Sequence, residues 1–267
     1  MDNYKLKEGN FTGNTLNSQV LDRYIVSVTE HIPNVQVPKH AHEHSYISLV
    51  LHGFYKEQSN LAEQKLISGA SLFRRHDYEH KNEIGPTKSL CFNLEIKNDF
   101  FNNEFTTTHD PCFKFEHNSI EVLNMYLSYQ RNFSKELLSL TIDENAYLLF
   151  SRGKMNTRTE HTEWDHKIKK QVRFNPEQKY SIDQVANSLH MHPVYFVRKF
   201  KALNGVTFGE FLIRQRLKKA IDLIHYSNNN LTTIALESGF YDQSHFIKRF
   251  KEAFHITPTH YMELTKS

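Results

Sequence analysis

Three histidines in the N-terminal half, His40, His42 and His80, have side chains that could hold a metal ion. Imidazole nitrogens suit zinc and similar divalent ions, and an ion bound by three of them keeps a further position open. The same imidazoles, together with Tyr46, could instead line a pocket for a small molecule. We predict the ligand pocket, assign no metal, no other cofactor and no catalytic residue, and keep a divalent ion at the three histidines as the alternative.

A second group of residues with chemical potential lies in a repeat near the C-terminus. The segment 185–207 aligns with the segment 234–257 at an offset of 49 residues before a turn and 50 after it. The alignment pairs Ala186 with Ala235, Phe196 with Phe246, Phe200 with Phe250, and Lys201 with Lys251. Each segment predicts a short helix, a tight turn and a second helix, over 182–188 and 193–203 in the first and over 232–237 and 242–254 in the second.

The second helix of each repeat has one apolar and one basic face. The phenylalanines four residues apart must face the interior, which leaves the opposite face exposed. A basic face with amide and hydroxyl groups suits insertion into the major groove, where cations contact phosphates and Arg, Gln or Ser contact base edges. The predicted DNA-binding residues are His192, Val194, Tyr195, Arg198, Lys201, Gln243, Ser244, His245, Lys248 and Lys251.

A further helix, predicted over 208–226, connects the two repeats because its apolar residues recur at helical spacing. Such a helix extends about 28 Å at about 1.5 Å per residue. Successive major grooves on one face of a duplex lie roughly 34 Å apart. One chain is therefore expected to occupy two adjacent grooves.

With these motifs, residues from about 164 to 262 resemble the DNA-binding domain of the AraC/XylS family of bacterial transcription regulators. The family pattern is matched by Ala235, Gly239-Phe240, Asp242-Gln243-Ser244-His245-Phe246, Arg249-Phe250-Lys251 and Thr257-Pro258-Thr259-His260-Tyr261. His255 stands where the family usually has the glycine that ends the helix, which predicts a left-handed backbone at His255. Met262 replaces the usual arginine, which would remove a phosphate or capping contact. The resemblance implies double-stranded DNA and RNA polymerase as partners.

Between about residues 20 and 100, short β-prone runs separated by turn residues predict a small antiparallel barrel or sandwich. This part resembles the cupin-like sensor domain of many such regulators, because His40-x-His42 precedes Gly53 by eleven residues and Gly69 precedes His80 by eleven. Tyr46 stands where metal-binding cupins usually carry glutamate, and Arg75-His76-Asp77 replaces their Pro-x-Gly. The resemblance implies a small-molecule effector.

Two helices are predicted at about 118–150. Ile120, Leu123 and Leu127 form an apolar stripe on the first of them. The stripe either covers the barrel or, as the resemblance implies, forms the interface of a homodimer. Both alternatives stay open, and we name these three residues as candidate dimerisation residues.

Composition and charge fit this division. The chain of 267 residues is 39% hydrophobic and 24% charged, as is usual for globular proteins. We expect no secretory signal, no membrane partner and a cytoplasmic location, since no apolar run approaches the roughly 18 residues of a membrane span. Cys91 and Cys112 lie in no metal or redox spacing and are expected to be reduced. Residues 163–267 hold 16 basic and 10 acidic residues, whereas residues 1–162 hold 17 and 20, so the excess of basic charge lies in the part predicted to bind DNA.

The sequence therefore predicts an α+β protein of two domains. Residues 1–155 form a cupin-like sensing and dimerisation domain, residues 156–163 a linker, and residues 164–267 an all-α domain with two helix-turn-helix units. The predicted function is sequence-specific, ligand-responsive transcription regulation without enzyme activity. The alternative is a metal-binding cupin enzyme with an accessory DNA-binding unit, which explains the three histidines and leaves the repeat without a role. The sequence leaves open the effector, the operator and the choice between activation and repression.

Overall fold

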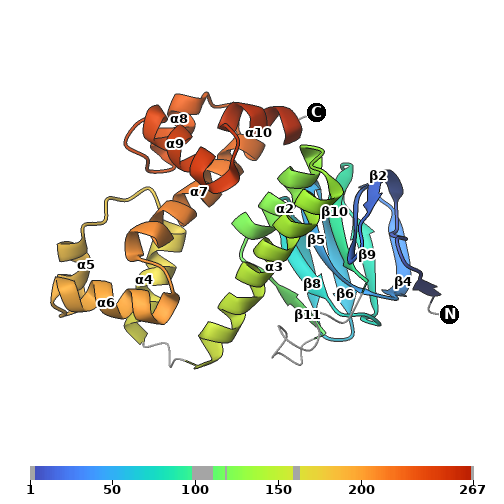
Figure 1. Ribbon diagram of the computed structural model, residues 1–267, viewed down its shortest axis with the longest axis horizontal. Coiled ribbons are helices and arrows are strands. Elements are labelled where there is room, and N and C mark those ends of the chain that lie inside the picture. The colour runs from blue at the N-terminus through green and yellow to red at the C-terminus, as the bar shows by residue number, and fades with distance from the viewer. Residues whose placement is uncertain (1–3, 98–110, 118, 159–162, 266–267) are drawn as a thin grey trace. The chain divides into compact units, whose positions relative to one another are not determined.

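The computed structural model of the chain describes residues 4–97, 111–117, 119–158 and 163–265, with the backbone alone for 151–158 (Figure 1). The chain divides into two compact units, Met1–Tyr147 and Leu148–Ser267. Each unit is described by itself. Within the described residues, no helix has both the length and the apolar character that crossing a membrane requires.

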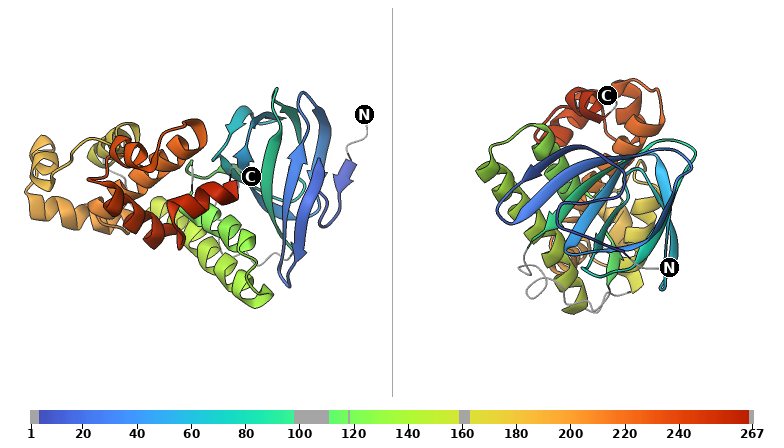
Figure 2. Two further views of the ribbon diagram at one scale, coloured as in Figure 1. Left: turned by 90° about the horizontal axis from the view of Figure 1, so that it is seen from above. Right: turned by 90° about the vertical axis from the view of Figure 1, so that its right-hand side faces the viewer.

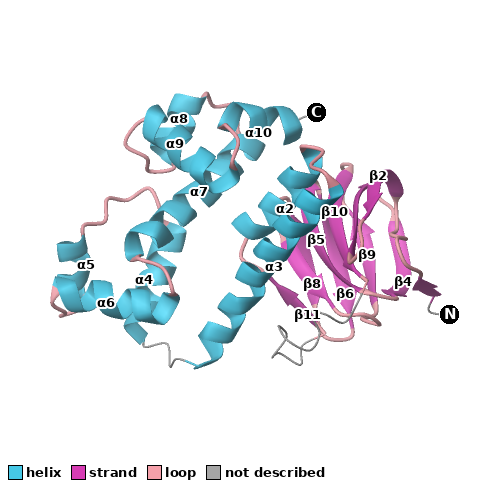
Figure 3. Ribbon diagram, viewed as in Figure 1, coloured by secondary structure: helices cyan, strands magenta, loops and turns pink. Residues whose placement is uncertain are grey.

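The first unit is built from strands followed by two helices (Figure 3). Its strands are β1 (Tyr4–Leu6), β2 (Asn14–Val20), β3 (Tyr24–His31), β4 (Gln36–His42), β5 (Ser45–His52), β6 (Phe54–Ser59), β7 (Glu63–Ile67), β8 (Ser71–Arg74), β9 (His80–Ile84), β10 (Ser89–Ile96) and β11 (Cys112–Lys114). They form a five-stranded sheet in the order β1-β4-β9-β6-β7 and a six-stranded sheet in the order β11-β8-β5-β10-β3-β2. The predicted antiparallel fold is confirmed, with two differences: it begins at β1, well before residue 20, and β1 pairs with β4 in parallel.

The centre of the six-stranded sheet is buried on both faces, as β10 shows. Side chains alternate across a strand, so Cys91 and Asn93 line a cavity while Phe92 points to the opposite face. There the Phe92 ring lies 5.6 Å from the ring of Tyr126 on α2 (Ile120–Gln130). Helix α3 (Lys135–Arg158) lies beside α2 (Figure 2), and its Asp143 accepts a hydrogen bond of 2.6 Å from the hydroxyl of Tyr24. Helices thus cover the outer face of this sheet.

The apolar stripe on α2 is part of this covering layer. Ile120, Leu123 and Leu127 are only 7%, 3% and 1% exposed. The prediction that they form a dimer interface is wrong for these side chains, because the sheet behind them also needs an apolar cover and takes it from α2. On α3, by contrast, Leu137 and Leu140 are 47% and 65% exposed.

The predicted linker at 156–163 is also wrong in extent. Helix α3 continues to Arg158, and the next helix, α4, begins at Glu163, while residues 159–162 lie outside the described residues. The division between the two compact units falls after Tyr147, inside α3. The polar run continues the helix because Arg, Lys and Met are good helix formers and Gly153 is its only strong helix breaker.

The second unit is all-α, as predicted. Its helices are α4 (Glu163–Phe174), α5 (Ile182–Ser188), α6 (Pro193–Asn204), α7 (Phe208–Tyr226), α8 (Leu231–Glu237), α9 (Gln243–Phe254) and α10 (Pro258–Thr265). Helices α5 and α7 begin and end at the predicted residues. Helix α4 was not predicted, although Ile168 and Val172 supply an apolar spacing of four, and both are buried in the same cluster as Phe196.

Candidate functional site

The two helix-turn-helix units repeat down to their backbone hydrogen bonds. In the first turn, the N–H of Met191 donates to the carbonyl of Ala186 at 2.9 Å. In the second turn, the N–H of Phe240 donates to the carbonyl of Ala235 at 2.9 Å. Donors and acceptors are both separated by the offset of 49 residues found in the sequence. The repeat is therefore a repeat of structure.

Each unit also has two left-handed backbone positions, filled by one glycine and one histidine. At the turns, His190 has φ 54° and Gly239 has φ 92°. At the ends of α6 and α9, Gly205 has φ 70° and His255 has φ 58°. The left-handed prediction for His255 is confirmed. A Cβ at Gly239 would lie 2.5 Å from the Cα of Glu177, so no larger residue fits that turn.

Aromatic packing fixes the rotation of α6 and α9. Phe196 and Phe200 on α6 are fully buried, with their rings 5.8 Å apart. Phe246 and Phe250 on α9 are fully buried as well, 5.6 Å apart. Because the apolar face of each helix is held inside the unit, the opposite face must point to solvent.

The predicted DNA-binding residues divide into two groups. Eight of them are exposed: His192, Val194, Tyr195, Arg198, Lys201, Ser244, Lys248 and Lys251. The other two are partly buried and already bonded within the unit. Gln243 accepts a hydrogen bond of 2.6 Å at Oε1 from the hydroxyl of Thr232, and Nε2 of His245 accepts one of 3.3 Å from Nε of Arg249. Their contact with DNA stays a prediction, and their positions are partly set by these bonds.

A side-chain cap begins each of the two helices, and one of the caps is the predicted residue His192. The Nδ1 atom of His192 accepts a hydrogen bond of 3.3 Å from the N–H of Val194 at the start of α6. At the start of α9, Oδ1 of Asp242 accepts one of 2.7 Å from the N–H of His245. Such caps fix where the first turn of each helix begins, and with it which residues the start of the helix exposes.

Some basic residues of the unit are paired within it, whereas four exposed cations of α6 and α9 are not. Arg249 forms an ion pair of 2.9 Å with Glu252, and Lys169 forms one of 2.7 Å with Asp165. Four exposed cations make neither a hydrogen bond nor an ion pair with any described residue: Arg198, Lys201, Lys248 and Lys251. Their charge is therefore available to an external anion.

One exposed aromatic residue escaped the sequence prediction. Tyr241 is 87% exposed and directly precedes the N-cap of α9. A ring in this position could make apolar contact with thymine methyl groups or pack against the DNA backbone. The available signal was a large aromatic residue inside a turn, where polar residues are usual.

The second site is a cavity in the first unit, lined from both sheets. Its lining residues are Phe11, Thr12, Thr29, His31, His40, His42, Tyr46, Ser48, Tyr55, Arg74, His80, Asn82, Ile84, Cys91 and Asn93. His40 on β4 stands opposite His80 on β9 in the antiparallel register, and His42 lies two residues further along the same face of β4. One ring nitrogen from each of the three lies within 4.8 Å of the others. All four predicted pocket residues thus come together, and ligand binding stays a prediction.

Hydrogen bonds define the tautomers of two of these histidines. Nδ1 of His40 lies 2.9 Å from the carbonyl oxygen of Pro38, and Nδ1 of His80 lies 3.1 Å from that of Tyr78. A carbonyl oxygen only accepts, so each Nδ1 carries the proton and each Nε2 has a lone pair. The hydroxyl of Tyr46, 3.3 Å from Nε2 of His80, can donate to one of these lone pairs.

Burial keeps the cluster neutral. It lowers the pKa of His42 to about 2, with the neighbouring His80 and His40 acting in the same direction. The pKa of His40 is also lowered by burial, and that of His80 lies well below its usual value because of burial and the positive charge of Arg74. Neutral imidazoles are the form that binds metal ions.

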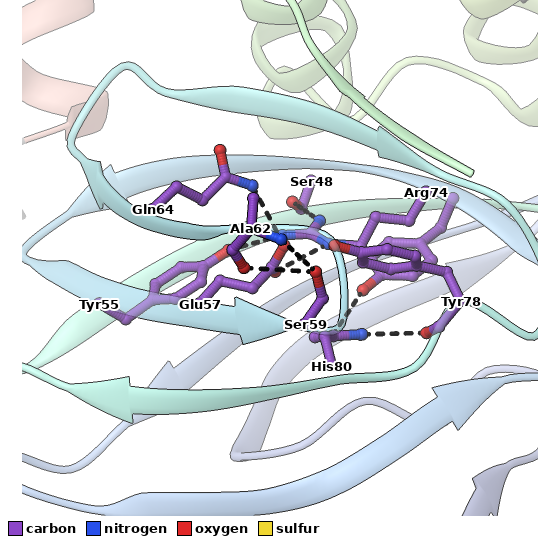
Figure 4. Close-up of polar contacts among 10 residues, drawn as sticks. Ser48, Tyr55, Glu57, Ser59, Ala62, Gln64, Arg74, Tyr78 and His80 are labelled. Atoms are coloured by element: carbon purple, nitrogen blue, oxygen red, sulfur yellow. Dashed lines mark hydrogen bonds and ion pairs between the residues drawn. The ribbon is translucent and has the colours of Figure 1, made fainter. Parts of the chain in front are cut away.

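A buried ion pair beside the histidines was not predicted from the sequence (Figure 4). The side chains of Arg74 and Glu57 are each 1% exposed, and Oε2 of Glu57 accepts hydrogen bonds of 2.9 Å and 2.5 Å from Nε and Nη2 of Arg74. Arg74 also donates to the hydroxyls of Ser48 at 2.6 Å and Tyr55 at 3.2 Å. Burial alone would lower the pKa of Arg74, but the Glu57 carboxylate raises it well above its usual value. The pair is therefore charged and internally satisfied.

Comparison with known proteins agrees with this geometry. The family described as "Helix-turn-helix domain" matches residues 185–263. The regulatory protein PocR of Salmonella typhimurium is 30% identical over 105 residues, which are 38% of this chain and 35% of PocR. The transcriptional activator RhaS of Escherichia coli is 24% identical over 259 residues, covering 87% of this chain and 90% of RhaS. The chain is similar to transcription regulators of the AraC/XylS family.

These similarities cover different parts of the chain. The match spans only about a third of the length of PocR. The similarity to the solved structure of ToxT from Vibrio cholerae covers 92% of this chain and 100% of ToxT, with a TM-score of 0.40 and 15% identity. The chemistry of the cavity therefore follows from the residues of this chain alone.

Proposed function

We propose that this chain is a bacterial transcription regulator of the AraC/XylS type that inserts α6 and α9 into two adjacent major grooves. One observation carries the proposal: the two helices present exposed cations at matching positions, 50 residues apart. Arg198 corresponds to Lys248 and Lys201 to Lys251, and none of the four has an ion-pair partner in the described chain. Cations without internal partners are the groups that neutralise phosphates and contact base edges.

The first unit is proposed to sense a small effector and to change the regulator's activity. The chain would act in the cytoplasm and contact RNA polymerase, and activation is the proposed outcome because RhaS is described as an activator. No enzymatic role is proposed. In its support, the described lining of the cavity contains no Asp or Glu, and Glu57 beside it is held by Arg74. A carboxylate available for acid or base catalysis is thus missing from that lining.

We propose further that the regulator acts as a homodimer joined through α3. The support is the pair of exposed apolar side chains on that helix, Leu137 and Leu140, which are a turn apart on the same face. Replacing both by Glu should give a folded monomer in sedimentation experiments, because neither side chain contributes to the core. A double variant that sediments like the wild type would exclude this interface.

Selection of duplexes from a random library by the purified full chain tests the DNA-binding proposal. The enriched sequences should contain two conserved blocks about 10–10.5 base pairs apart, the spacing of adjacent major grooves on one face. Binding of an enriched duplex should weaken steeply with salt, by a slope of about 0.9 per phosphate contact. The proposal would be contradicted if no sequence were enriched, or if the affinity for an enriched duplex did not change with salt concentration.

A further inference from the structure

We propose that Arg216 on α7 is a positioning residue, which holds the second helix-turn-helix against the first and so sets the base-pair spacing between the two DNA blocks. This role rests on the proposed function, because it requires α6 and α9 to enter two grooves at once. It adds to that function a side chain that acts without touching DNA. The contacts involved meet at residues 175–179, which connect α4 to α5 and are called the bracing loop below.

The bracing loop is attached at both ends to the core of the first helix-turn-helix. At its start, the N–H of Asn175 donates to the carbonyl of Gln171 on α4 at 3.0 Å. Just past its end, the hydroxyl of Tyr180 donates to the carbonyl of Asn175 at 3.1 Å. The ring of Tyr180 also lies 6.1 Å from that of Phe208, which is buried in the same cluster as Phe196. The loop is therefore positioned by the first helix-turn-helix.

Arg216 binds this loop through two backbone carbonyls. Its Nε donates to the carbonyl of Pro176 at 2.9 Å, and its Nη2 donates to that of Gln178 at 3.0 Å. On the same helix, Nζ of Lys219 lies 2.7 Å from the carboxylate of Glu177. A planar guanidinium presents its donors in a fixed geometry, so two such bonds define a direction as well as a distance. Three consecutive residues of the loop are thus bonded to α7.

The turn of the second helix-turn-helix packs on the same loop. A Cβ added at Gly239 would lie 2.5 Å from the Cα of Glu177 and 2.9 Å from Nε of Arg216. The matching position of the first repeat, His190, is also left-handed but carries an exposed side chain. A turn of this kind therefore tolerates a side chain. The bracing loop and Arg216 are what require glycine at position 239.

These contacts tie the direction of α9 to that of α6. Helix α7 connects the two repeats, and long helices bend gently along their length. A loop of the first helix-turn-helix that is bonded to α7 and packed on the second turn restricts such bending. One base-pair step shifts the next groove by roughly 3.4 Å and turns it by roughly 34°. A small change in the angle between α6 and α9 therefore changes which spacing fits.

The first experiment measures the Kd of full-length Arg216→Ala for an enriched duplex and for versions with one base pair inserted or removed between the blocks. In wild type, either change should weaken binding at least about fivefold, since α9 loses at least one base contact. In Arg216→Ala this ratio should fall at least about twofold, the lower end of coupling between groups in contact. An unchanged ratio would overturn the proposal even if every duplex bound more weakly, because lost stability or a lost phosphate contact affects all spacings alike.

Two further variants complete this experiment. Lys170→Ala is the matched control, because it removes a positive charge from an exposed position on α4 and should keep the wild-type ratio. Arg216→Lys preserves the charge and covers the case in which Arg216→Ala does not fold. It should also lower the ratio, since an ammonium lacks the planar pair of donors. A wild-type ratio in Arg216→Lys, or an equal fall in Lys170→Ala, would refute the role of Arg216.

Hydrogen exchange of the full chain tests the brace without DNA. In Arg216→Ala the amides of residues 175–179 and of the second turn, 238–240, should exchange roughly 2–12-fold faster, as expected when a hydrogen bond of usual net strength is lost. Those of the first turn, 189–192, should keep the wild-type rate. Wild-type exchange at the second turn would exclude the brace. Failure to enrich any duplex would refute the proposed function, and the exchange rates would still decide whether Arg216 holds the two repeats together.

Discussion

Replacing Arg198 by Ala tests whether α6 enters a major groove. Arg198 is exposed and forms no hydrogen bond or ion pair with the described residues, so its removal should leave the stability of the unit within about 0.5 kcal/mol of wild type. If its guanidinium contacts a guanine through two hydrogen bonds, the loss in specific binding should be about 1–3 kcal/mol. That corresponds to roughly 5–150-fold in Kd at a single salt concentration. Lys248→Ala should have a similar effect in the second groove.

Fluorescence anisotropy with a selected duplex provides the assay, and full salt titrations separate two kinds of contact. A base contact changes preference among sequences, whereas a phosphate contact weakens binding to all sequences and lowers the salt slope by about 1. Lys170→Ala is the matched control, because it removes the same charge from an exposed position on α4. Wild-type affinity in both Arg198→Ala and Lys248→Ala would refute the proposed orientation of the two helices. An equal loss of affinity in Lys170→Ala would show that the effect comes from the net charge of the unit and not from the position of the cation.

Further predictions concern stability and can be measured by chemical unfolding of the full chain. Glu57→Leu should destabilise the sensor unit by about 3–5 kcal/mol because it leaves the buried Arg74 unpaired, whereas adding Arg74→Met should recover most of that loss; equal stability of the single and double variants would contradict this. His255→Gly should stabilise the second unit by about 0.5–1 kcal/mol. A left-handed residue other than glycine costs about 1–2 kcal/mol, and part of this gain is offset because glycine loses more backbone entropy on folding. No change in the unfolding midpoint would refute this prediction. Leu123→Asp should unfold the sensor unit and not merely separate subunits. Circular dichroism would then show a loss of folded structure, whereas a folded monomer would change sedimentation alone. With a chelator present, stability should be constant above about pH 6.5 and fall below it by up to about 1.4 kcal/mol per pH unit for His42, because its folded pKa lies below its unfolded pKa and the unfolded state gains the proton first; stability that is flat from pH 7 to 5 would contradict this assignment.

The DNA-binding unit was the part that the sequence specified most completely. Its signals are local: the phenylalanines at spacings of four, the cap at Asp242, and the left-handed turn at Gly239 all act within a few residues of themselves. Short-range hydrogen bonds and helical periodicity translate directly into structure. For this reason the amino-acid sequence alone predicts the bounds of α5 to α9 to within one residue and the inward faces of α6 and α9. The left-handed backbone at His255 followed from the glycine that the resembling family usually has there.

The spacing of apolar residues along the chain predicts which face of a helix is buried, but not which surface that face packs against. The stripe of Leu123 and Leu127 predicted a buried side of α2 correctly, but periodicity does not name the partner. A second subunit and the sheet of the same unit would select the same residues. Only the folded unit decided between them, because Leu123 and Leu127 are buried within it and Tyr126 of the same helix packs on Phe92 of the sheet.

The sensor cavity depended most on tertiary structure. The sequence alone determined that His40 and His42 share one face of a strand, since side chains alternate with a period of two. That His80 stands opposite His40 was decided by the register of β4 with β9, and the pairing of Glu57 with Arg74 by the meeting of β6 and β8 across the two sheets. Such contacts join residues 17 to 40 positions apart. They follow from how strands pair and sheets pack over the whole unit, and short-range forces along the chain do not fix that choice.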